Sequence, residues 1–143
     1  MIKKIGIASD HAGYLSKKKL CEYMLSKDFH VKDLGCDSEE SVDYPEYGVK
    51  LGKAVANKDV DLGVAICGSG IGISIAANKV KGVRAALCTS DFHAEMSKRH
   101  NDANIIAFGA KVSSINEMIS MFDIWISSKF EFGRHEKRIQ LIG

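Results

Sequence analysis

Residues 62–74 read LGVAICGSGIGIS, and this stretch decides the fold. Residues 62–67 are a short apolar run with the length and composition of a buried β-strand. Glycines at alternate positions follow the run, and the chain then continues into a helical segment that reaches residue 79. A buried strand that turns through a glycine loop into a helix is typical of a β-α-β unit, in which the strands are parallel.

Four more short apolar runs alternate with longer segments of helical period, at residues 5–8, 31–34, 83–87 and 105–108. Most are apolar on both faces, as a sheet covered by helices on each side requires. Right-handed crossovers then give an α/β fold, a single-domain, doubly wound, Rossmann-like sheet of five parallel strands with helices on both faces. The 143 residues suit one domain, so we expect it to span residues 1–143.

The helices are predicted from apolar stripes with a period of 3.6 residues. The last long helix is the clearest, because Ser114 and Glu117 form a capping box at its start. Pro45, the only proline, suits the first turn of the second helix. The stripes are Leu20, Cys21, Met24 and Leu25; Tyr47, Leu51, Ala54 and Val55; Phe92 and Met96; and Ile115, Met118, Ile119, Phe122, Trp125 and Ile126.

Composition excludes several classes of protein. Twenty Lys and Arg against 18 Asp and Glu leave a net charge of +2, too balanced for neutralising nucleic acid or coating an anionic membrane. No apolar run approaches the length of a membrane span, and the first residues lack the apolar core of a signal peptide. The four cysteines contain no C-x-x-C pair, so we expect reduced thiols and a cytoplasmic location.

The glycine loop after residue 67 is predicted to be a cradle for an anion or oxyanion. Its glycines let the backbone approach a ligand, and the next helix points its free N–H groups at the same place. Cys67 stands at the mouth of the loop, where a helix N-terminus favours a thiolate that can act as base or nucleophile. The alternative is a small buried hydrophobe, which is our interpretation of Cys21, Cys36 and Cys88.

Asp10 and His11 follow the first strand, at the sheet edge where ligands of such folds bind. Asp10 is a favoured type of helix cap, and His11 could be an ordinary surface residue. The functional interpretation is that the two side chains form a polar pair facing a substrate.

Two further groups of polar residues lie near the C-terminus. His100 and Asn101 end the fourth helix, where such residues usually form a cap and a turn. Arg134 and Arg138 are four residues apart and would share one face of a helix. Arginine binds phosphate through two parallel hydrogen bonds, although a run of charges is more often a solvated surface.

Together these stretches resemble the type B ribose-5-phosphate isomerases and the wider sugar-phosphate isomerase family, which includes the galactose-6-phosphate isomerase subunits. The matching segments run in the expected order from residue 9 to residue 138. Each is weak alone, but together they are highly specific. They are Ser9-Asp10-His11-Ala12-Gly13, Asp43-Tyr44-Pro45, residues 66–79, His100-Asn101-Asp102, Ala107-Phe108-Gly109, and Gly133-Arg134-His135 with Arg138.

The resemblance implies an interconversion of D-ribose 5-phosphate and D-ribulose 5-phosphate, a step of the pentose phosphate pathway. The reaction would proceed through a cis-enediolate without a metal or organic cofactor. Cys67 is implied as the base, and the enediolate oxygen would be bound by the hydroxyl of Ser69 and the backbone of Gly68, Gly70 and Gly72. Ser69 stands where many members have Thr, and both residues supply a hydroxyl.

The resemblance also assigns the opening of the sugar ring to His100, with Asp10 helping to handle the sugar hydroxyls. Phosphate binding falls to Arg134 and Arg138, helped by His11. The remaining positions implied to bind substrate are Tyr44, Ser74 and Asn101.

In the family, the residues matched by His100 and Asn101 meet the loop of Cys67 across a subunit interface. This implies a homodimer or a dimer of dimers with shared active sites. The tail at about residues 130–143 ends in apolar side chains, and we expect it to pack on the partner subunit.

Three alternatives remain at this point. One is a hexose-phosphate isomerase of the same family, acting on allose 6-phosphate or galactose 6-phosphate. Another is a non-catalytic phosphate-binding module on the same type of sheet. A cysteine hydrolase fits less well, because only a second chain could supply its histidine. No residues have metal-ligand spacing, so we expect no metal requirement, and the expected partners are a phosphosugar and copies of this chain.

Overall fold

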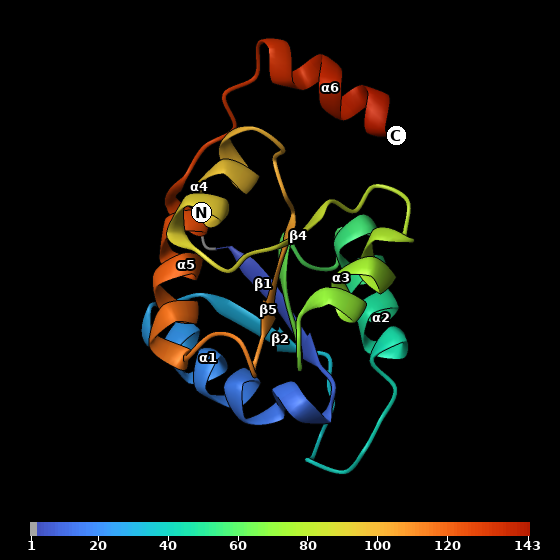
Figure 1. Cartoon of the computed structure of the whole chain (residues 1–143), viewed down its shortest axis with the longest axis vertical. Coiled ribbons are helices and arrows are strands. Elements are labelled where there is room, and N and C mark those ends of the chain that lie inside the picture. Colours follow the sequence, from blue (N-terminus) through green and yellow to red (C-terminus); the bar gives the residue numbers. More distant parts are fainter. Residues whose placement is uncertain (1–2) are drawn as a thin grey trace.

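Five strands form one parallel sheet in the order β2-β1-β3-β5-β4 in a computed structural model that describes residues 3–143 (Figure 1). All four neighbouring pairs are parallel. The doubly wound α/β fold predicted from the sequence is therefore confirmed. The strands are β1 (Lys4–Ser9), β2 (His30–Asp33), β3 (Leu62–Cys67), β4 (Ala85–Leu87) and β5 (Ile105–Gly109).

Helices cover both faces of this sheet (Figure 1). One face carries α1 (Tyr14–Ser26) and α5 (Ile115–Ser127), and the other carries α2 (Tyr44–Ala56) and α3 (Ile71–Asn78). The predicted capping box of Ser114 and Glu117 and the predicted place of Pro45 in the first turn of α2 are confirmed. The remaining helices are the 3-10 turn η1 (His11–Gly13), α4 (Asp91–Arg99) and α6 (Arg134–Ile142).

Each face of the sheet has its own apolar core. Around α1 and α5, the core joins the sheet to aromatic side chains, and Phe122 contacts Phe29 and Trp125 at ring-centroid distances of 5.7 and 6.1 Å. The other core is made of smaller side chains, with Leu51 of α2 and Ile73 of α3 fully buried. Cys67 belongs to this second core, at the end of a strand buried along its whole length.

The two edge strands differ from the prediction. Most of β2 is exposed, because it forms one edge of the sheet and has a neighbouring strand on only one side. At the opposite edge, β4 begins at Ala85 rather than at residue 83 and is only half-buried. The apolar runs therefore identified the strands but overestimated the burial of those at the edges.

Two predicted helix stripes are partly wrong. Leu25 of α1 is 58% exposed, and Phe92 of α4 is 66% exposed. In α1, Leu20 and Met24 are buried as predicted, and the third buried residue is Lys17. The ammonium of Lys17 lies 2.6 Å from Asp33 Oδ2. Because lysine is rarely buried and here depends on its contact with Asp33, a count of apolar residues cannot find this face. Within residues 3–143, none of the helices has the length and apolar character that crossing a membrane requires.

Phe122→Ala should lower the free energy of unfolding by about 3–5 kcal/mol, because it leaves a cavity among packed aromatic rings. Phe92→Ala removes the same side chain from an exposed position and should change it by about 0.5 kcal/mol or less. Urea unfolding of the two variants measures both effects. Similar losses in the two variants would contradict the described packing.

Candidate active site

The sheet reverses its direction of winding between β1 and β3, and this reversal places the first group of candidate residues. From β1 the chain crosses to β2 on one side, whereas β3 and the later strands lie on the other. Ligands of such folds bind outside the carboxyl ends of the two strands at this point. Asp10 follows β1 and Cys67 ends β3, and the register pairs Ser9 with Ile66, so the two residues leave the sheet side by side.

The loop after Cys67 directs a backbone donor at its sulfur. The N–H of Gly70 donates a hydrogen bond to Cys67 Sγ, with a donor–acceptor distance of 3.1 Å. Gly70 has a φ of 79°, a left-handed conformation that turns the chain into α3. The sulfur therefore lies at the N-terminal end of a helix, where the backbone dipoles favour a negative charge.

Neighbouring backbone holds this loop in place. The N–H groups of Ala110 and Lys111, just after β5, donate to the carbonyls of Cys67 and Gly68 at 2.8 and 3.0 Å. Gly109 lies so close that a Cβ there would come within 2.5 Å of the Ser69 carbonyl oxygen. The position of the sulfur is thus set by main-chain packing.

The hydroxyls of this loop and its helix have different orientations. Ser69 Oγ accepts the N–H of Ile71 at 3.1 Å, so its own proton is available to a ligand. Ser74 is 7% exposed, and its hydroxyl donates to the carbonyl of Ile71 at 2.8 Å. Ser69 can therefore donate to a substrate oxygen, whereas Ser74 supports the first turn of α3.

Asp10 both caps a turn and belongs to the polar group at this edge. It is 6% exposed, and its Oδ1 accepts the N–H of Gly13 at 3.1 Å. His11 Nδ1 accepts the N–H of Val42 at 3.1 Å, so a neutral His11 carries its proton on Nε2 and can donate it to a ligand. The structure confirms the cap at Asp10, and the polar pair facing a substrate stays a prediction.

Tyr44 begins α2 beside the glycine loop, and a Cβ at Gly72 would come within 2.5 Å of its ring. The tyrosine is 40% exposed, so part of it remains accessible to a ligand. The carbon chain of Lys111 passes next to Gly68, at 3.7 Å from the position of a Cβ there. Sequence reasoning did not identify this lysine, because it lies in a turn and belongs to no recognisable motif.

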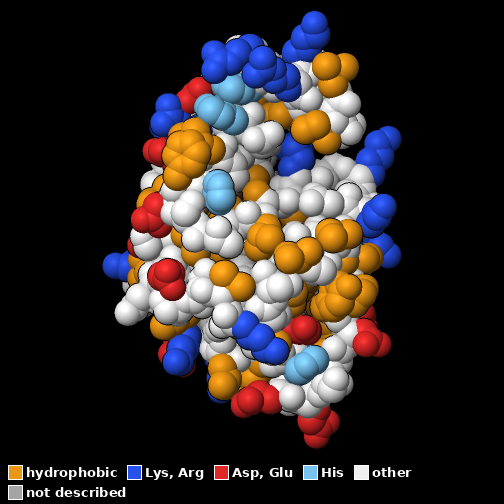
Figure 2. Space-filling view, in the orientation of Figure 1, with side chains coloured by type: hydrophobic (Ala, Val, Ile, Leu, Met, Phe, Trp, Pro, Cys, Tyr) orange, Lys and Arg blue, Asp and Glu red, His pale blue; other side chains and the backbone are white. Residues whose placement is uncertain are grey.

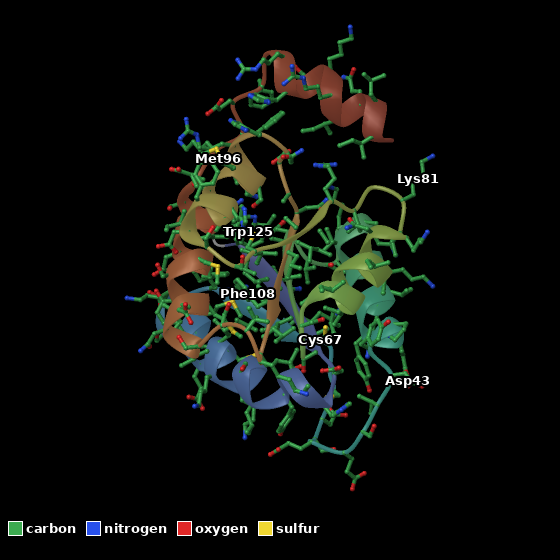
Figure 3. The ribbon with its side chains drawn as sticks, in the orientation of Figure 1. Asp43, Cys67, Lys81, Met96, Phe108 and Trp125 are labelled. Carbon is green, nitrogen blue, oxygen red and sulfur yellow. The ribbon has the colours of Figure 1, made fainter. Side chains whose placement is uncertain are left out.

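His100 and Asn101 lie at the other end of the strands, the amino end, away from Cys67. They follow α4 and precede β5, whereas Cys67 lies beside the far end of β5, in register with Gly109. Figure 3 shows Cys67 at one end of the sheet and Met96 of α4 toward the other. At about 3.3 Å per residue, the length of β5 separates the two groups by roughly 15 Å. One copy of the chain does not bring His100 to Cys67.

His100 belongs to a second cluster, with Glu131 and His135. The imidazole rings of His100 and His135 are stacked, with centroids 4.2 Å apart and planes 12° apart. Glu131 Oε1 lies 3.8 Å from Nε2 of His100 and 3.5 Å from Nε2 of His135. Its other oxygen, Oε2, accepts a hydrogen bond from Arg99 Nε at 2.6 Å.

The charges around this cluster shift two pKa values. The hydrogen bond from Arg99 lowers the pKa of the Glu131 carboxyl, so it is ionised near neutral pH. Burial lowers the pKa of His135, and the positive charges of His100 and Arg134 lower it further. His135 is therefore neutral near pH 7.

Arg134 and Arg138 are both exposed on α6, which confirms that the segment is helical. Figure 2 shows a group of Lys and Arg side chains at this end of the molecule, with histidine side chains next to them. The two arginines therefore lie near His100 rather than near His11. The residues predicted to bind phosphate are thus divided between two ends of the molecule.

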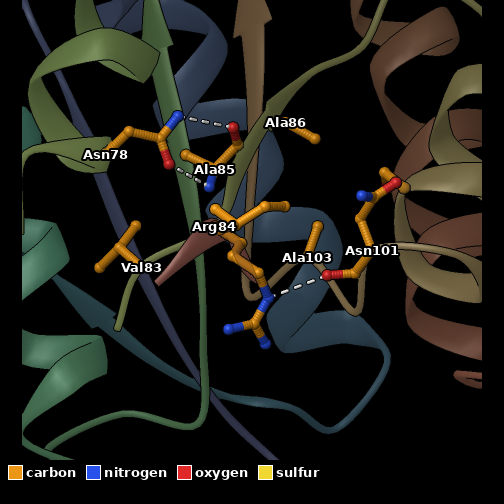
Figure 4. Close-up of a pocket in the computed structure, with 9 residues that line it drawn as sticks. Asn78, Val83, Arg84, Ala85, Ala86, Asn101 and Ala103 are labelled. Atoms are coloured by element: carbon orange, nitrogen blue, oxygen red, sulfur yellow. Dashed lines mark hydrogen bonds between the residues drawn. The ribbon is translucent and has the colours of Figure 1, made fainter. Parts of the chain in front are cut away.

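A cavity of about 340 Å³ lies beside Asn101, between the edge strand β4 and the end of α6 (Figure 4). Arg84 crosses it and donates from Nε to the carbonyl oxygen of Asn101 at 2.9 Å. Asn78 lines the far side and forms hydrogen bonds with both backbone groups of Ala85, at 2.9 and 2.7 Å. Asn101 is exposed and lines this cavity, and its hydrogen bond with Arg84 is made by its backbone carbonyl.

Comparison with known proteins identifies the family of this chain. The model of the Ribose/Galactose Isomerase family matches residues 5–142. The chain belongs to this family. It is 40% identical to ribose-5-phosphate isomerase B of Escherichia coli K12 over 141 residues, which cover 99% of this chain and 95% of the relative.

Solved structures of family members have the same fold. The chain is similar to ribose-5-phosphate isomerase B of Clostridium thermocellum with a TM-score of 0.97 and 46% identity, covering 98% of this chain and 95% of that one. It is also similar to ribose-5-phosphate isomerase B of Mycoplasma genitalium with bound ribulose-5-phosphate, with a TM-score of 0.92 and 40% identity. That match covers 97% of this chain and 93% of the other.

The cysteines of this family member have different surroundings. Cys36 and Cys88 are buried as predicted, whereas Cys21 is partly exposed. Burial raises the pKa of Cys88 to about 11, and burial together with the charge of Asp33 raises that of Cys21 to about 11. Both thiols are therefore protonated at neutral pH and are poor nucleophiles.

In the native protein at pH 8, Cys21 and Cys88 should react very slowly with iodoacetamide. A thiol with a pKa of about 11 is ionised in only about one molecule in a thousand at that pH. Peptide mass spectrometry of the labelled chain measures each rate, and guanidinium-unfolded protein is the control. Labelling rates equal to those of the unfolded chain would contradict the raised pKa values of Cys21 and Cys88. A labelling rate that stops rising with pH near pH 9 would contradict them too.

Proposed function

We propose that this chain is an aldose–ketose isomerase that interconverts D-ribose 5-phosphate and D-ribulose 5-phosphate. The observation that carries the proposal is the sulfur of Cys67, which accepts the N–H of Gly70 at 3.1 Å and follows the strand next to the one that Asp10 follows. Membership of the Ribose/Galactose Isomerase family supports the reaction class. Similarity to a relative with bound ribulose-5-phosphate supports the choice of sugar.

In this proposal Cys67 is the base. Its thiolate removes the proton from C2 of the open-chain aldose and returns it to C1, and the negative charge passes through a cis-enediolate. The proton of the C2 hydroxyl passes to the oxygen on C1, so that the aldehyde becomes a hydroxyl and C2 becomes the ketone. The Gly70 N–H and the start of α3 are directed at the sulfur. Proton transfer between adjacent carbons moves no electrons to another molecule, so the reaction requires no redox cofactor.

The developing enediolate charge requires fixed donors. The backbone from Gly68 to Gly72 faces it, and Ser69 donates its free hydroxyl proton. Ser74 holds the first turn of α3, and Tyr44 forms the wall of the pocket beside Gly72. Because these groups are held by main-chain packing, they need little reorganisation during the reaction.

We assign the remaining steps to side chains from both ends of the chain. His100 opens the furanose ring by moving a proton between the ring oxygen and the anomeric hydroxyl, and Asn101 contacts the sugar. Asp10 accepts hydrogen bonds from sugar hydroxyls through Oδ2, which accepts none within residues 3–143. Arg134 and Arg138 bind the phosphate, and His11 donates to it from Nε2.

A homodimer with shared active sites reconciles this assignment with the roughly 15 Å between the two groups. A two-fold axis perpendicular to the strands would place the His100 end of one copy against the Cys67 edge of its partner, twice per dimer. The exposed apolar residues fit such an interface, with Leu141 of α6 76% exposed and Ile71 and Ile75 of α3 52% and 55% exposed. The tail at about residues 130–143 would then pack on the partner, and two dimers could associate further.

The free cysteines support a cytoplasmic location, because an oxidising compartment would favour disulfide formation. No nucleic acid or membrane partner is proposed.

The purified chain should convert ribose 5-phosphate to ribulose 5-phosphate without added metal, and Cys67→Ala should lower kcat at least about 100-fold. Replacing Cys88, a buried thiol outside the site, with Ala is the matched control and should retain turnover. Activity is followed by ribulose formation, with allose 6-phosphate and galactose 6-phosphate assayed in parallel. Turnover of a hexose phosphate alone would show that the substrate is not ribose 5-phosphate. Unchanged turnover by Cys67→Ala would show that Cys67 is not the base.

A second experiment tests the shared site. Cys67→Ala and His100→Ala should each be inactive, but after refolding together they should recover about a quarter of wild-type specific activity. Half of the dimers would then be mixed, and each mixed dimer has one intact site of two. Cys67→Ala refolded with Cys67→Ala,His100→Ala is the control and should stay inactive. No recovery despite a dimeric mass in sedimentation would contradict the shared site.

A further inference from the structure

We propose that His100, Glu131 and His135 form a binding site for a divalent cation of the zinc class. One possible ligand atom from each residue lies within 4.8 Å of the other two. The three residues come from the end of α4, the segment before α6 and the first turn of α6. Glu131 and His135 are four residues apart, and the fold brings His100 to them from the end of α4. The spacing of histidines along the chain therefore did not predict the site.

The carboxylate of Glu131 is held in the orientation that a metal requires. Both Nε and Nη2 of Arg99 contact its Oε2 at 2.6 Å, and this contact turns Oε1 toward the two imidazoles. Backbone adds to the arrangement, because the N–H of Glu131 donates to the carbonyl of Arg99 at 3.0 Å. An oxygen fixed in this way, facing two imidazole Nε2 atoms, is an arrangement found around bound zinc.

A second and independent observation comes from His135. The residue is 6% exposed, and within residues 3–143 its Nε2 is buried without a hydrogen-bond partner. Buried polar atoms nearly always have a partner, so an unpaired nitrogen that faces a carboxylate oxygen at 3.5 Å indicates a missing ligand. A cation between the two atoms would bind both.

The chemistry of the three residues selects the type of ion. Two imidazoles and one carboxylate are the ligand set of open tetrahedral zinc sites, whose fourth position is taken by water. Ligand atoms in such a site are about 3.4 Å apart, and Glu131 Oε1 lies 3.5 and 3.8 Å from the two imidazole nitrogens. The three ligand atoms lie within 4.8 Å of one another, so the two imidazole nitrogens must move closer together when the ion binds. The stacked rings must tilt apart so that both lone pairs point at the ion. Mg²⁺ and Ca²⁺ prefer oxygen ligands and fit poorly.

Bound zinc would block turnover rather than support it. His100 cannot transfer a proton to or from the sugar while its nitrogen is a metal ligand, so zinc and phosphosugar should exclude each other. This consequence rests on the proposed role of His100 in ring opening. The zinc site itself rests only on the geometry of the three side chains.

Calorimetric titration with zinc chloride in phosphate-free buffer tests the site directly. The wild-type chain should bind one equivalent per chain, and Glu131→Gln should weaken binding at least about tenfold, since loss of even a ligand's partner costs about 10- to 100-fold. Glu95→Gln is the matched control, because Glu95 also contacts Arg99, at 3.6 Å, but is not among the three ligands. It should bind zinc as the wild type does.

His135→Gln removes a second of the three ligands and should also weaken zinc binding, whereas the exposed His30→Gln is its control and should bind as the wild type does. Because His135 is buried, circular dichroism checks that His135→Gln keeps its native fold. Binding of Co²⁺ gives a second readout, because its visible spectrum reports tetrahedral nitrogen ligands and should be lost in Glu131→Gln. No zinc binding by the wild type, or equal binding by Glu131→Gln and wild type, would overturn the proposal. Zinc binding without inhibition would overturn the mutual exclusion and the role of His100, but not the site.

Discussion

The common direction of all five strands is the constraint on which the rest of the structure depends. Residues that follow a strand lie at the carboxyl edge of the sheet, and residues that precede one lie at the amino edge. Cys67 and Asp10 therefore share one edge, while His100 lies at the other. A single chain could unite them only by reversing a strand in the middle of its core. A second copy can do so without any change of fold, and the proposed dimer follows from this.

The Cys67 edge depends mainly on backbone contacts. Its sulfur receives an N–H from Gly70, and the loop is fastened by N–H groups that follow β5. Gly70 and Gly109 permit contacts so close that a Cβ at either would lie 2.5 Å from a neighbouring atom. The side chain at Ser69 is consequently free to vary between hydroxyl-bearing residues while the sulfur keeps its place.

The other end depends on side chains. Arg99 fixes Glu131, and Glu131 in turn faces two histidines. One of them, His135, is buried, and its Nε2 has no hydrogen-bond partner in the part of the chain that the structure describes. Such an arrangement can respond to what binds there, because imidazole rings rotate more easily than packed backbone moves. The two halves of the proposed site thus differ in stiffness, with the rigid half carrying the base and the adaptable half carrying the phosphate and ring-opening groups.

The sequence predicts features that depend on local pattern, and less of those that depend on distant contacts. The strand at residues 62–67, the glycine loop and the capping box at Ser114 were predictable because periodicity and turn chemistry act over a few residues. The exposure of Phe92 and the burial of Lys17 depend on which element lies opposite, and the pattern within one helix does not contain that information. Glu131 lies in an irregular segment between two helices and was missed for the same reason.

The amide of Asn78 also limits how copies of this chain can join. It occupies both the N–H and the carbonyl of Ala85 on the outer side of β4, an edge strand of only three residues. A backbone whose hydrogen-bonding groups are already occupied cannot accept another strand, so β4 offers little template for extending the sheet. At this edge of the sheet, subunits can therefore make contact only through helices and loops, and the sheet is not extended beyond Ala85 of β4.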